Sequence, residues 1–220
     1  MKKIFHKLIV IALIIGSLAI YTCCFSIGTI GNGNLVTSER TVSAFEKISC
    51  SGNAEVRFHV GEEYRVVVTV DENLDEYVEI STKNNVLNIG IKKGYKCLFT
   101  KFLVNVYCPV LTDVSLTGSG KIEGVIECDN FSAIITGSGR ITVSGTSKNT
   151  SIKITGSGNF SGKEFTINNA TVKITGSGQA NVCVEDNLNA HITGSGEINY
   201  YGEPKKVDSK VSGSGRIRKL

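Results

Sequence analysis

A glycine-rich motif recurs through the second half of the chain and is the first feature that could bind a ligand. It occurs as TGSG five times and as SGSG once, between Thr117 and Gly215. Glycine-rich loops cradle phosphates where one such loop joins a strand to a helix N-terminus, usually with Lys and Ser or Thr after the last glycine. Here every motif leads into another segment rich in β-branched residues, which is typical of strands. The pattern therefore predicts structural turns, whose glycines are Gly118, Gly120, Gly137, Gly139, Gly156, Gly158, Gly176, Gly178, Gly194, Gly196, Gly213 and Gly215.

Carboxylates are the second group that could do chemistry. A glycan lyase or hydrolase needs acidic residues clustered on one face, either as an acid–base pair or as a calcium site. Apart from near neighbours, the acidic residues of the repeats do not share a repeat position: Glu123, Glu127, Asp129, Glu164, Glu185, Asp186, Glu197 and Glu203. We therefore expect a protein that is not an enzyme, with a polysaccharide-acting lyase or hydrolase as the alternative.

Cysteine and histidine show no metal-ligand spacing. The chain has no CxxC pair, and its three histidines, His6, His59 and His191, are scattered. We expect no metal and no cofactor. The cysteines beyond the N-terminal region are interpreted as small buried hydrophobic residues rather than disulfides: Cys50, Cys97, Cys108, Cys128 and Cys183.

The spacing of the motifs reveals the elements that carry them. The first residue of successive motifs is separated by 19, 19, 20, 18 and 19 residues. An asparagine (a lysine in the last unit) precedes each later motif by a constant six residues, so all length variation lies between a glycine turn and the next asparagine. A unit this short must bury its apolar face against its neighbours. The period predicts an all-β fold, a right-handed parallel β-helix or β-solenoid with coils of about 19 residues over 113–220.

Alternation within each unit identifies the core. Apolar residues precede the first motif residue (Leu116, Ile135, Ile154, Ile174, Ile192, Val211) and follow the turn (Ile122, Ile141, Phe160, Ala180, Ile198, Ile217). Period two predicts strands with one buried face. Residues 40–112 lack clear repeats but contain strand-like segments, with Ser49–Gly52 in the place of a turn, so we expect less regular first coils of the same domain, 40–220.

The N-terminus is typical of an export signal. Lys2, Lys3 and Lys7 precede an apolar run of about 14 residues, shorter than the roughly 20 that span a bilayer, so residues 1–22 are predicted to be a signal peptide. Cys23 and Cys24 follow and are candidates for lipidation. Residues 23–39 are interpreted as a tether or an N-terminal cap. Removing these three lysines from the 24 basic residues leaves 21 against 20 acidic ones, and this near balance argues against nucleic-acid binding.

One family resemblance is specific. The stretch RTVSAFEKISCSGNAEVRFHVGEEYRVVVTVDENLDEYVEISTKNNVLNIGIKKG, followed by PVLTDVSLTGSGKIEG, resembles the putative auto-transporter adhesin head GIN domain family. The resemblance covers roughly residues 40–220. It implies an exported β-helical domain, often on a lipoprotein, in the periplasm or at the outer membrane or cell surface of a Gram-negative bacterium. It implies no catalytic residues and little about activity.

Two functions are consistent with these features besides the enzyme. One is an adhesin-like envelope protein that contacts a glycan, and the other is an envelope scaffold with no glycan ligand. A stacked outward column, Ser115, Ile134, Lys153, Lys173, His191 and Lys210, could hold an anionic glycan or lipid headgroup, with Lys153, Lys173, His191 and Lys210 as binding residues. The same pattern is typical of solvated lysines. The expected partners are a glycan or envelope component, and a membrane only through a lipid anchor.

Overall fold

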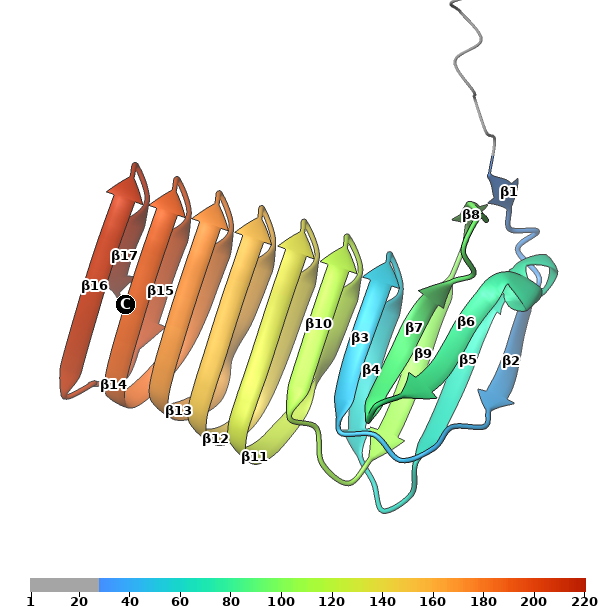
Figure 1. Cartoon of the computed structure of the whole chain (residues 1–220), viewed down its shortest axis with the longest axis horizontal. Coiled ribbons are helices and arrows are strands. Elements are labelled where there is room, and N and C mark those ends of the chain that lie inside the picture. The colour runs from blue at the N-terminus through green and yellow to red at the C-terminus, as the bar shows by residue number, and fades with distance from the viewer. Residues whose placement is uncertain (1–27) are drawn as a thin grey trace, which may run out of the picture.

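The computed structural model describes residues 28–220, and over this range it is built almost wholly of strands (Figure 1). Two sheets face each other: the front sheet is turned toward the viewer in Figure 1, and the back sheet lies behind it. The elements are β1 (Thr29–Ile30), β2 (Leu35–Arg40), β3 (Lys47–Gly52), β4 (Glu55–Val60), β5 (Arg65–Asp71), the 3₁₀ helix η2 (Glu72–Tyr77), β6 (Val78–Lys83), β7 (Val86–Ile91), β8 (Cys97–Leu98), β9 (Phe102–Cys108), β10 (Asp113–Gly118), β11 (Lys121–Gly137), β12 (Arg140–Gly156), β13 (Asn159–Gly176), β14 (Gln179–Gly194), β15 (Glu197–Tyr201), β16 (Lys206–Gly213) and β17 (Arg216–Lys219).

Each of β11 to β14 runs down the back sheet, bends at a lower corner and runs up the front sheet to the next glycine turn (Figure 1). Neighbouring coils pair in parallel and in register, for example Ile135 with Ile154 and Gly137 with Gly156. Because the front strands rise, the back strands descend and successive coils advance to the left, the solenoid is right-handed. The predicted fold is confirmed.

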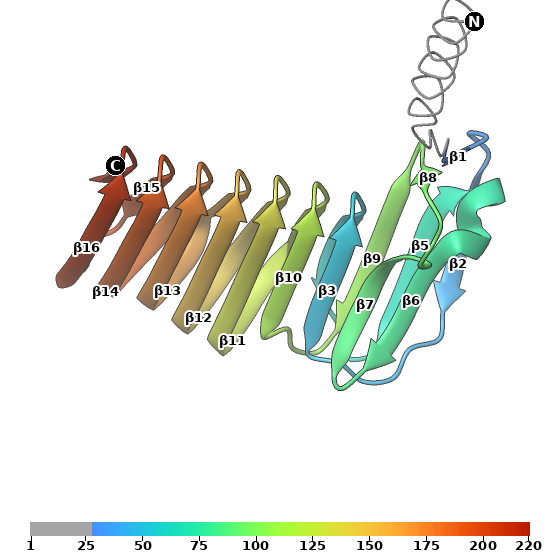
Figure 2. The same cartoon turned by 45° about the horizontal axis from the view of Figure 1, so that its top comes forward.

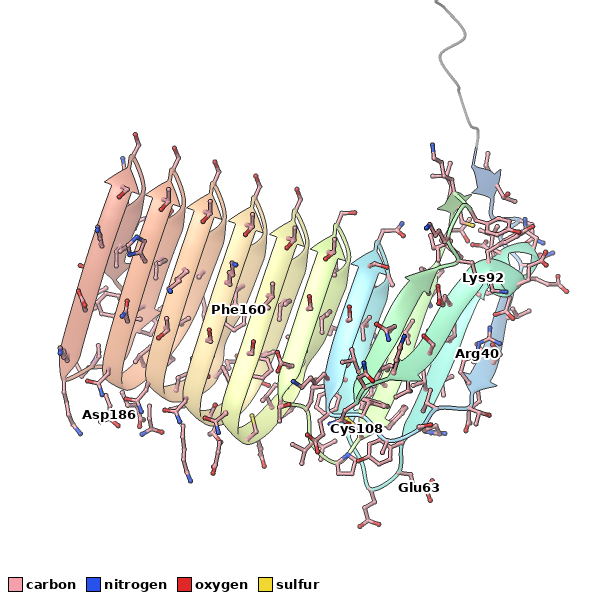
Figure 3. All side chains as sticks on the ribbon, in the orientation of Figure 1. Arg40, Glu63, Lys92, Cys108, Phe160 and Asp186 are labelled. Atoms are coloured by element: carbon pink, nitrogen blue, oxygen red, sulfur yellow. The ribbon has the colours of Figure 1, made fainter. Side chains whose placement is uncertain are left out.

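The core lies between the two sheets and consists of the predicted alternating positions. Leu116, Ile135 and Ile154 of the front sheet are fully buried, and so are Ile141 and Phe160 of the back sheet. Phe160 points into the space between the sheets (Figure 3). Two positions of the last coil are exceptions: Val211 in β16 is 41% exposed and Ile217 in β17 is half-buried, because each of these terminal strands packs against the rest of the stack from one side only.

The two glycines of each turn have different roles. The first adopts a left-handed backbone, with φ of 110° at Gly156, and a Cβ there would lie 2.6 Å from the carbonyl oxygen of Gly137 in the coil before. That carbonyl accepts a hydrogen bond from the N–H of Ser157, at 2.9 Å. The second glycine, Gly158, has an ordinary φ but faces the Ile135 side chain closely. The turn amides that would hold a phosphate are therefore used to join one coil to the next.

The lower corners are joined by a ladder of asparagine side chains. The Asn149 amide donates to the Asn130 Oδ1 at 3.1 Å, Asn169 donates to Asn149 at 3.1 Å, and Asn187 donates to Asn169 at 2.7 Å. Asn149 and Asn169 thus each donate to one neighbour and accept from the next, as equivalent residues on stacked strands can. The constant spacing between asparagine and glycine turn follows, because both ends of the front strand are fixed by coil-to-coil contacts.

The N-terminal part is less regular, as expected, and its spatial order differs from its order in the sequence. β3 and β4 form one more coil, in which Gly52 pairs with Gly118 of β10. β7 and β9 pair in parallel with β3 and β4 and lie beyond them, so the chain returns past its own first coil to begin β10. β5, β6 and β2 then close this end in antiparallel pairings (Figures 1 and 2).

A buried carboxylate fastens this cap. Asp71, fully buried, accepts hydrogen bonds from the Thr100 N–H at 2.8 Å, the Thr100 hydroxyl at 2.6 Å and the Gly33 N–H at 2.9 Å. Burial alone raises the pKa of Asp71, but the hydrogen bonds from Thr100, Gly33 and Lys101 together outweigh it and the pKa is lowered. The segment that precedes β2 is therefore held by the ionised form of one side chain.

Replacing Gly156 with Val tests the role of the first turn glycine. Valine would need an unfavourable left-handed backbone and would collide with the coil before it, so we expect the free energy of unfolding to fall by about 1 to 3 kcal/mol. Thermal unfolding followed by circular dichroism would measure it. Ser157→Ala, at the exposed neighbouring position, is the control and should leave the midpoint unchanged. Equal midpoints for Gly156→Val and wild type would contradict this account.

Replacing Asp71 with Asn tests whether the buried carboxylate holds the N-terminal cap. We expect a loss of about 1 to 3 kcal/mol at neutral pH, because buried donors lose a charged acceptor. A lowered folded-state pKa stabilises the fold above the unfolded-state pKa of about 3.9, and this contribution is lost as pH falls through the folded-state pKa. The stability difference between wild type and variant should therefore shrink below about pH 4. A difference that stays constant from neutral to acid pH would show that ionised Asp71 does not hold the cap.

Candidate functional site

The predicted outward column is aligned in the front sheet. Lys153 pairs with Lys173, Lys173 with His191, and His191 with Lys210. The three lysines are exposed and His191 is half-buried. Toward the capped end the same row continues through Ile134 and Ser115 to further polar residues, Ser49, Asn88 and Ser81.

The lysines of this column have no carboxylate partners. None of Lys153, Lys173 and Lys210 forms a salt bridge within the part of the chain that the structure describes. The rows on either side of the column in β12, β13 and β14 hold hydroxyl and amide side chains: Ser151, Thr155, Thr171, Thr175, Asn189 and Thr193. Some exposed lysines elsewhere are paired, as Lys148 is with Asp129 at 3.0 Å and Lys205 with Asp186 at 2.6 Å, whereas others, such as Lys121 and Lys206, form no salt bridge among the described residues.

A second candidate site is a groove of about 480 Å³ on the back sheet, near the lower corners of β4, β11, β12 and β13. It lies where the repeat is irregular. β13 has one more residue than β12 between the pairs Thr142–Ser161 and Ser144–Glu164, and this bulge contains Gly162 and Lys163. The longest spacing between motifs, 20 residues, therefore corresponds to a bulge that lines the groove.

The groove has an apolar floor and a polar rim. Phe58, Gly124, Val125 and Val143 provide apolar surface. The rim holds charged and hydroxyl side chains, namely Arg57, His59, Glu123, Thr142, Ser144, Ser161, Lys163 and Glu164. Sequence reasoning did not identify this site, because its residues come from four coils and share no motif. The additional residue in the third spacing was the only signal that could have located it.

One wall of the groove is fixed by stacked side chains. The His59 ring stacks on Tyr107 with ring centres 4.9 Å apart and planes 20° from parallel. The Arg65 guanidinium lies 4.4 Å from the centre of the Tyr107 ring. His59 Nε2 is 3.4 Å from Asn105 Oδ1, within hydrogen-bonding distance. The imidazole is thus held against the sheet before any ligand arrives.

The acidic residues of the repeats are mostly separated, as the sequence predicted. Asp129, Asp186, Glu197 and Glu203 each form a salt bridge with a basic side chain of a neighbouring strand or loop. Glu123 and Glu164 line the groove together, and the near neighbours Glu127 and Asp129 line a second, smaller hollow. Across residues 28–220 no three His, Cys, Asp or Glu side chains are grouped in a way that could hold a metal ion.

The cysteines that the structure describes behave as small hydrophobic residues. Cys50, Cys97 and Cys108 are buried, Cys128 and Cys183 are half-buried, and these five are all free thiols. Burial raises the pKa of the Cys50 and Cys108 thiols to about 12, so neither is a nucleophile at neutral pH. Cys23 and Cys24, the lipidation candidates, lie outside the described residues.

A family model described as putative auto-transporter adhesin, head GIN domain, matches residues 44–204. The chain belongs to this family. No curated protein is a significant match to the chain.

Solved structures of similar proteins agree with the fold. A putative lipid binding protein from Parabacteroides distasonis is 26% identical, with 87% of this chain and 99% of that chain covered and a TM-score of 0.56. A putative adhesin from Parabacteroides merdae is also 26% identical, covering 88% and 99% with a TM-score of 0.57. A putative adhesin from Bacteroides fragilis is 20% identical, covers 88% and 100% and has a TM-score of 0.72, which supports the fold alone.

The family description suggests an exported, adhesin-like envelope protein. From residue 28 onward, no helix is both apolar and long enough to cross a bilayer.

Proposed function

We propose that this head GIN domain is a non-enzymatic cell-envelope protein of a Gram-negative bacterium whose front sheet binds an anionic polysaccharide. The observation that carries the proposal is the column of Lys153, Lys173 and Lys210, which are aligned on stacked strands without carboxylate partners. His191 completes the column.

Electrostatics favours a polymeric anion. Strands in a sheet are about 4.8 Å apart, so Lys153 and Lys173 repel each other unless a counter-charge lies over them. Lys47, in β3 of the same sheet, has such a counter-charge in Asp113 of β10, at 3.4 Å. A polysaccharide that carries repeated carboxylate or sulfate groups would supply the missing charges along the solenoid axis. The flanking hydroxyl and amide rows offer hydrogen bonds to its sugar rings.

A lipid is the other source of anionic groups, because one relative is called a putative lipid binding protein. We favour the polysaccharide. The column runs straight along the stack on an open sheet face, which suits an extended polymer better than a single headgroup. An envelope scaffold without a glycan ligand would bind neither.

Removing the column charges tests this function. The triple variant Lys153→Ser, Lys173→Ser, Lys210→Ser should bind polygalacturonate or chondroitin sulfate about 10- to 100-fold more weakly, because each exposed ion pair contributes up to about 1 kcal/mol. Isothermal titration calorimetry would measure the affinity, with neutral dextran as the control polymer. Added salt should weaken wild-type binding.

The matched control removes the same charge elsewhere. Lys92, Lys93 and Lys96 are exposed, and Lys92 lies at the capped end, away from β12–β16 (Figure 3). Their replacement by Ser should leave affinity unchanged. Equal losses in both triple variants would mean that only net charge matters. Binding to vesicles that contain anionic phospholipid but not to the polysaccharides would favour the lipid, no binding to either would favour the scaffold, and cleavage of any polysaccharide would show an enzyme.

Membrane attachment is a separate part of the proposal. We expect export through the predicted signal peptide and lipidation at Cys23, with Cys24 as the alternative. Wild-type protein expressed in a Gram-negative host should partition into detergent and incorporate labelled palmitate, and Cys23→Ala should abolish both. Loss of label only in Cys24→Ala would identify Cys24 as the lipidated residue. Label retained in both single variants would contradict lipidation at this site.

A further inference from the structure

We propose that the back-sheet groove is a second binding site, specific for an uncharged oligosaccharide. It goes beyond the proposed front-sheet function, because it uses other residues, the opposite sheet and a ligand of different charge.

The size and position of the groove indicate a preformed ligand-binding site. Its volume of about 480 Å³ lies within the roughly 300 to 1,000 Å³ of small-ligand sites. It coincides with the bulge at Gly162 and Lys163 and with Gly124, where a Cβ would lie 2.6 Å from the Phe58 carbonyl oxygen. A regular coil would have placed ordinary strand residues at both positions.

The charges on the rim balance one another, which argues for an uncharged ligand. Arg57 is held by Glu55 at 2.6 Å and by Glu123 at 2.9 Å, so its charge is already compensated. The other two charged residues, Lys163 and Glu164, are of opposite sign, and Lys163 Nζ lies 5.4 Å from the centre of the Tyr201 ring. An anionic polymer suited to the front sheet would meet carboxylates here, so the two sheets select different ligands.

The lining suits a sugar ring, which has polar edges and a less polar face of C–H groups. Val125 is 45% exposed in the groove and offers an apolar surface to that face. Thr142, Ser144 and Ser161 offer hydroxyls, while Arg57 and Glu123 offer planar donors and acceptors to neighbouring sugar hydroxyls. Because four coils contribute, the groove extends along the stack and accommodates more than one sugar unit.

The fixed position of the His59 ring lowers the conformational entropy that is lost when a ligand binds. His59 is stacked on Tyr107 and lies within reach of Asn105, so its ring loses little conformational freedom when a ligand is bound. His59 is one of the residues that line the groove.

The test is an NMR titration of the mature protein with neutral tetrasaccharides of glucose, mannose, galactose, xylose and N-acetylglucosamine. At least one should shift the amide signals of Thr142, Ser144 and Ser161 while leaving those of Lys153 and Lys173 in place. Added salt should not weaken this binding.

Two variants locate the site. Thr142→Tyr should fill the groove, and His59→Ala should remove its wall, each weakening the binding by about tenfold or more. Thr155→Tyr is the matched control, because it places the same side chain on an exposed front-sheet position of the same element, β12, and should bind normally. The front-sheet triple lysine variant should also bind normally, so failure of one site is distinguishable from failure of the other.

Three outcomes would overturn the proposal: no shift with any of the neutral tetrasaccharides, shifts in the groove with charged saccharides only, or equal weakening by Thr142→Tyr and Thr155→Tyr.

Discussion

The close approach of one coil's backbone to the next at the glycine turns is the constraint on which the rest of the structure depends. The first glycine of each turn has no side chain between its backbone and the carbonyl of the coil before, and the serine that follows it donates to that carbonyl. The contact sets the distance between coils at the upper corner, and the asparagine ladder does so at the lower corner. With both ends of the front strand fixed, its side chains are forced into straight rows (Figure 3).

Rows of side chains are what give such a fold its binding chemistry. On a sheet whose strands are in register, one residue type repeated in the sequence becomes a continuous stripe in space, and lysine in successive repeats becomes a line of charge. The protein neutralises some charges at the lower corners and at β15–β17 by coil-to-coil ion pairs. The lysines of the front column have no such partner, and their alignment on stacked strands, rather than the number of lysines, is the basis of the proposed polysaccharide site.

The back sheet is irregular where the front sheet is regular. Length variation between repeats is confined to the segment between a glycine turn and the following asparagine, so irregularity accumulates on the back sheet while the front sheet stays regular. A bulge and a glycine there open a groove among four coils. A solenoid can thus keep one face as a periodic surface for a polymer and use the other for a local pocket with defined polar groups.

The sequence by itself determined the coils, their register and the core positions of residues 113–220. A 19-residue unit can bury its apolar side only against its neighbours, and alternation assigns residues such as Ile154 and Phe160 to the interior. It also placed the lysine column, because equal spacing becomes vertical alignment. Only the tertiary structure decided that β7 and β9 lie beyond β3 and β4, that antiparallel strands close this end, and that Asp71 fastens it. The groove belongs with these, because His59, Glu123, Thr142 and Lys163 are far apart in the chain, and their meeting depends on how four coils stack around one additional residue.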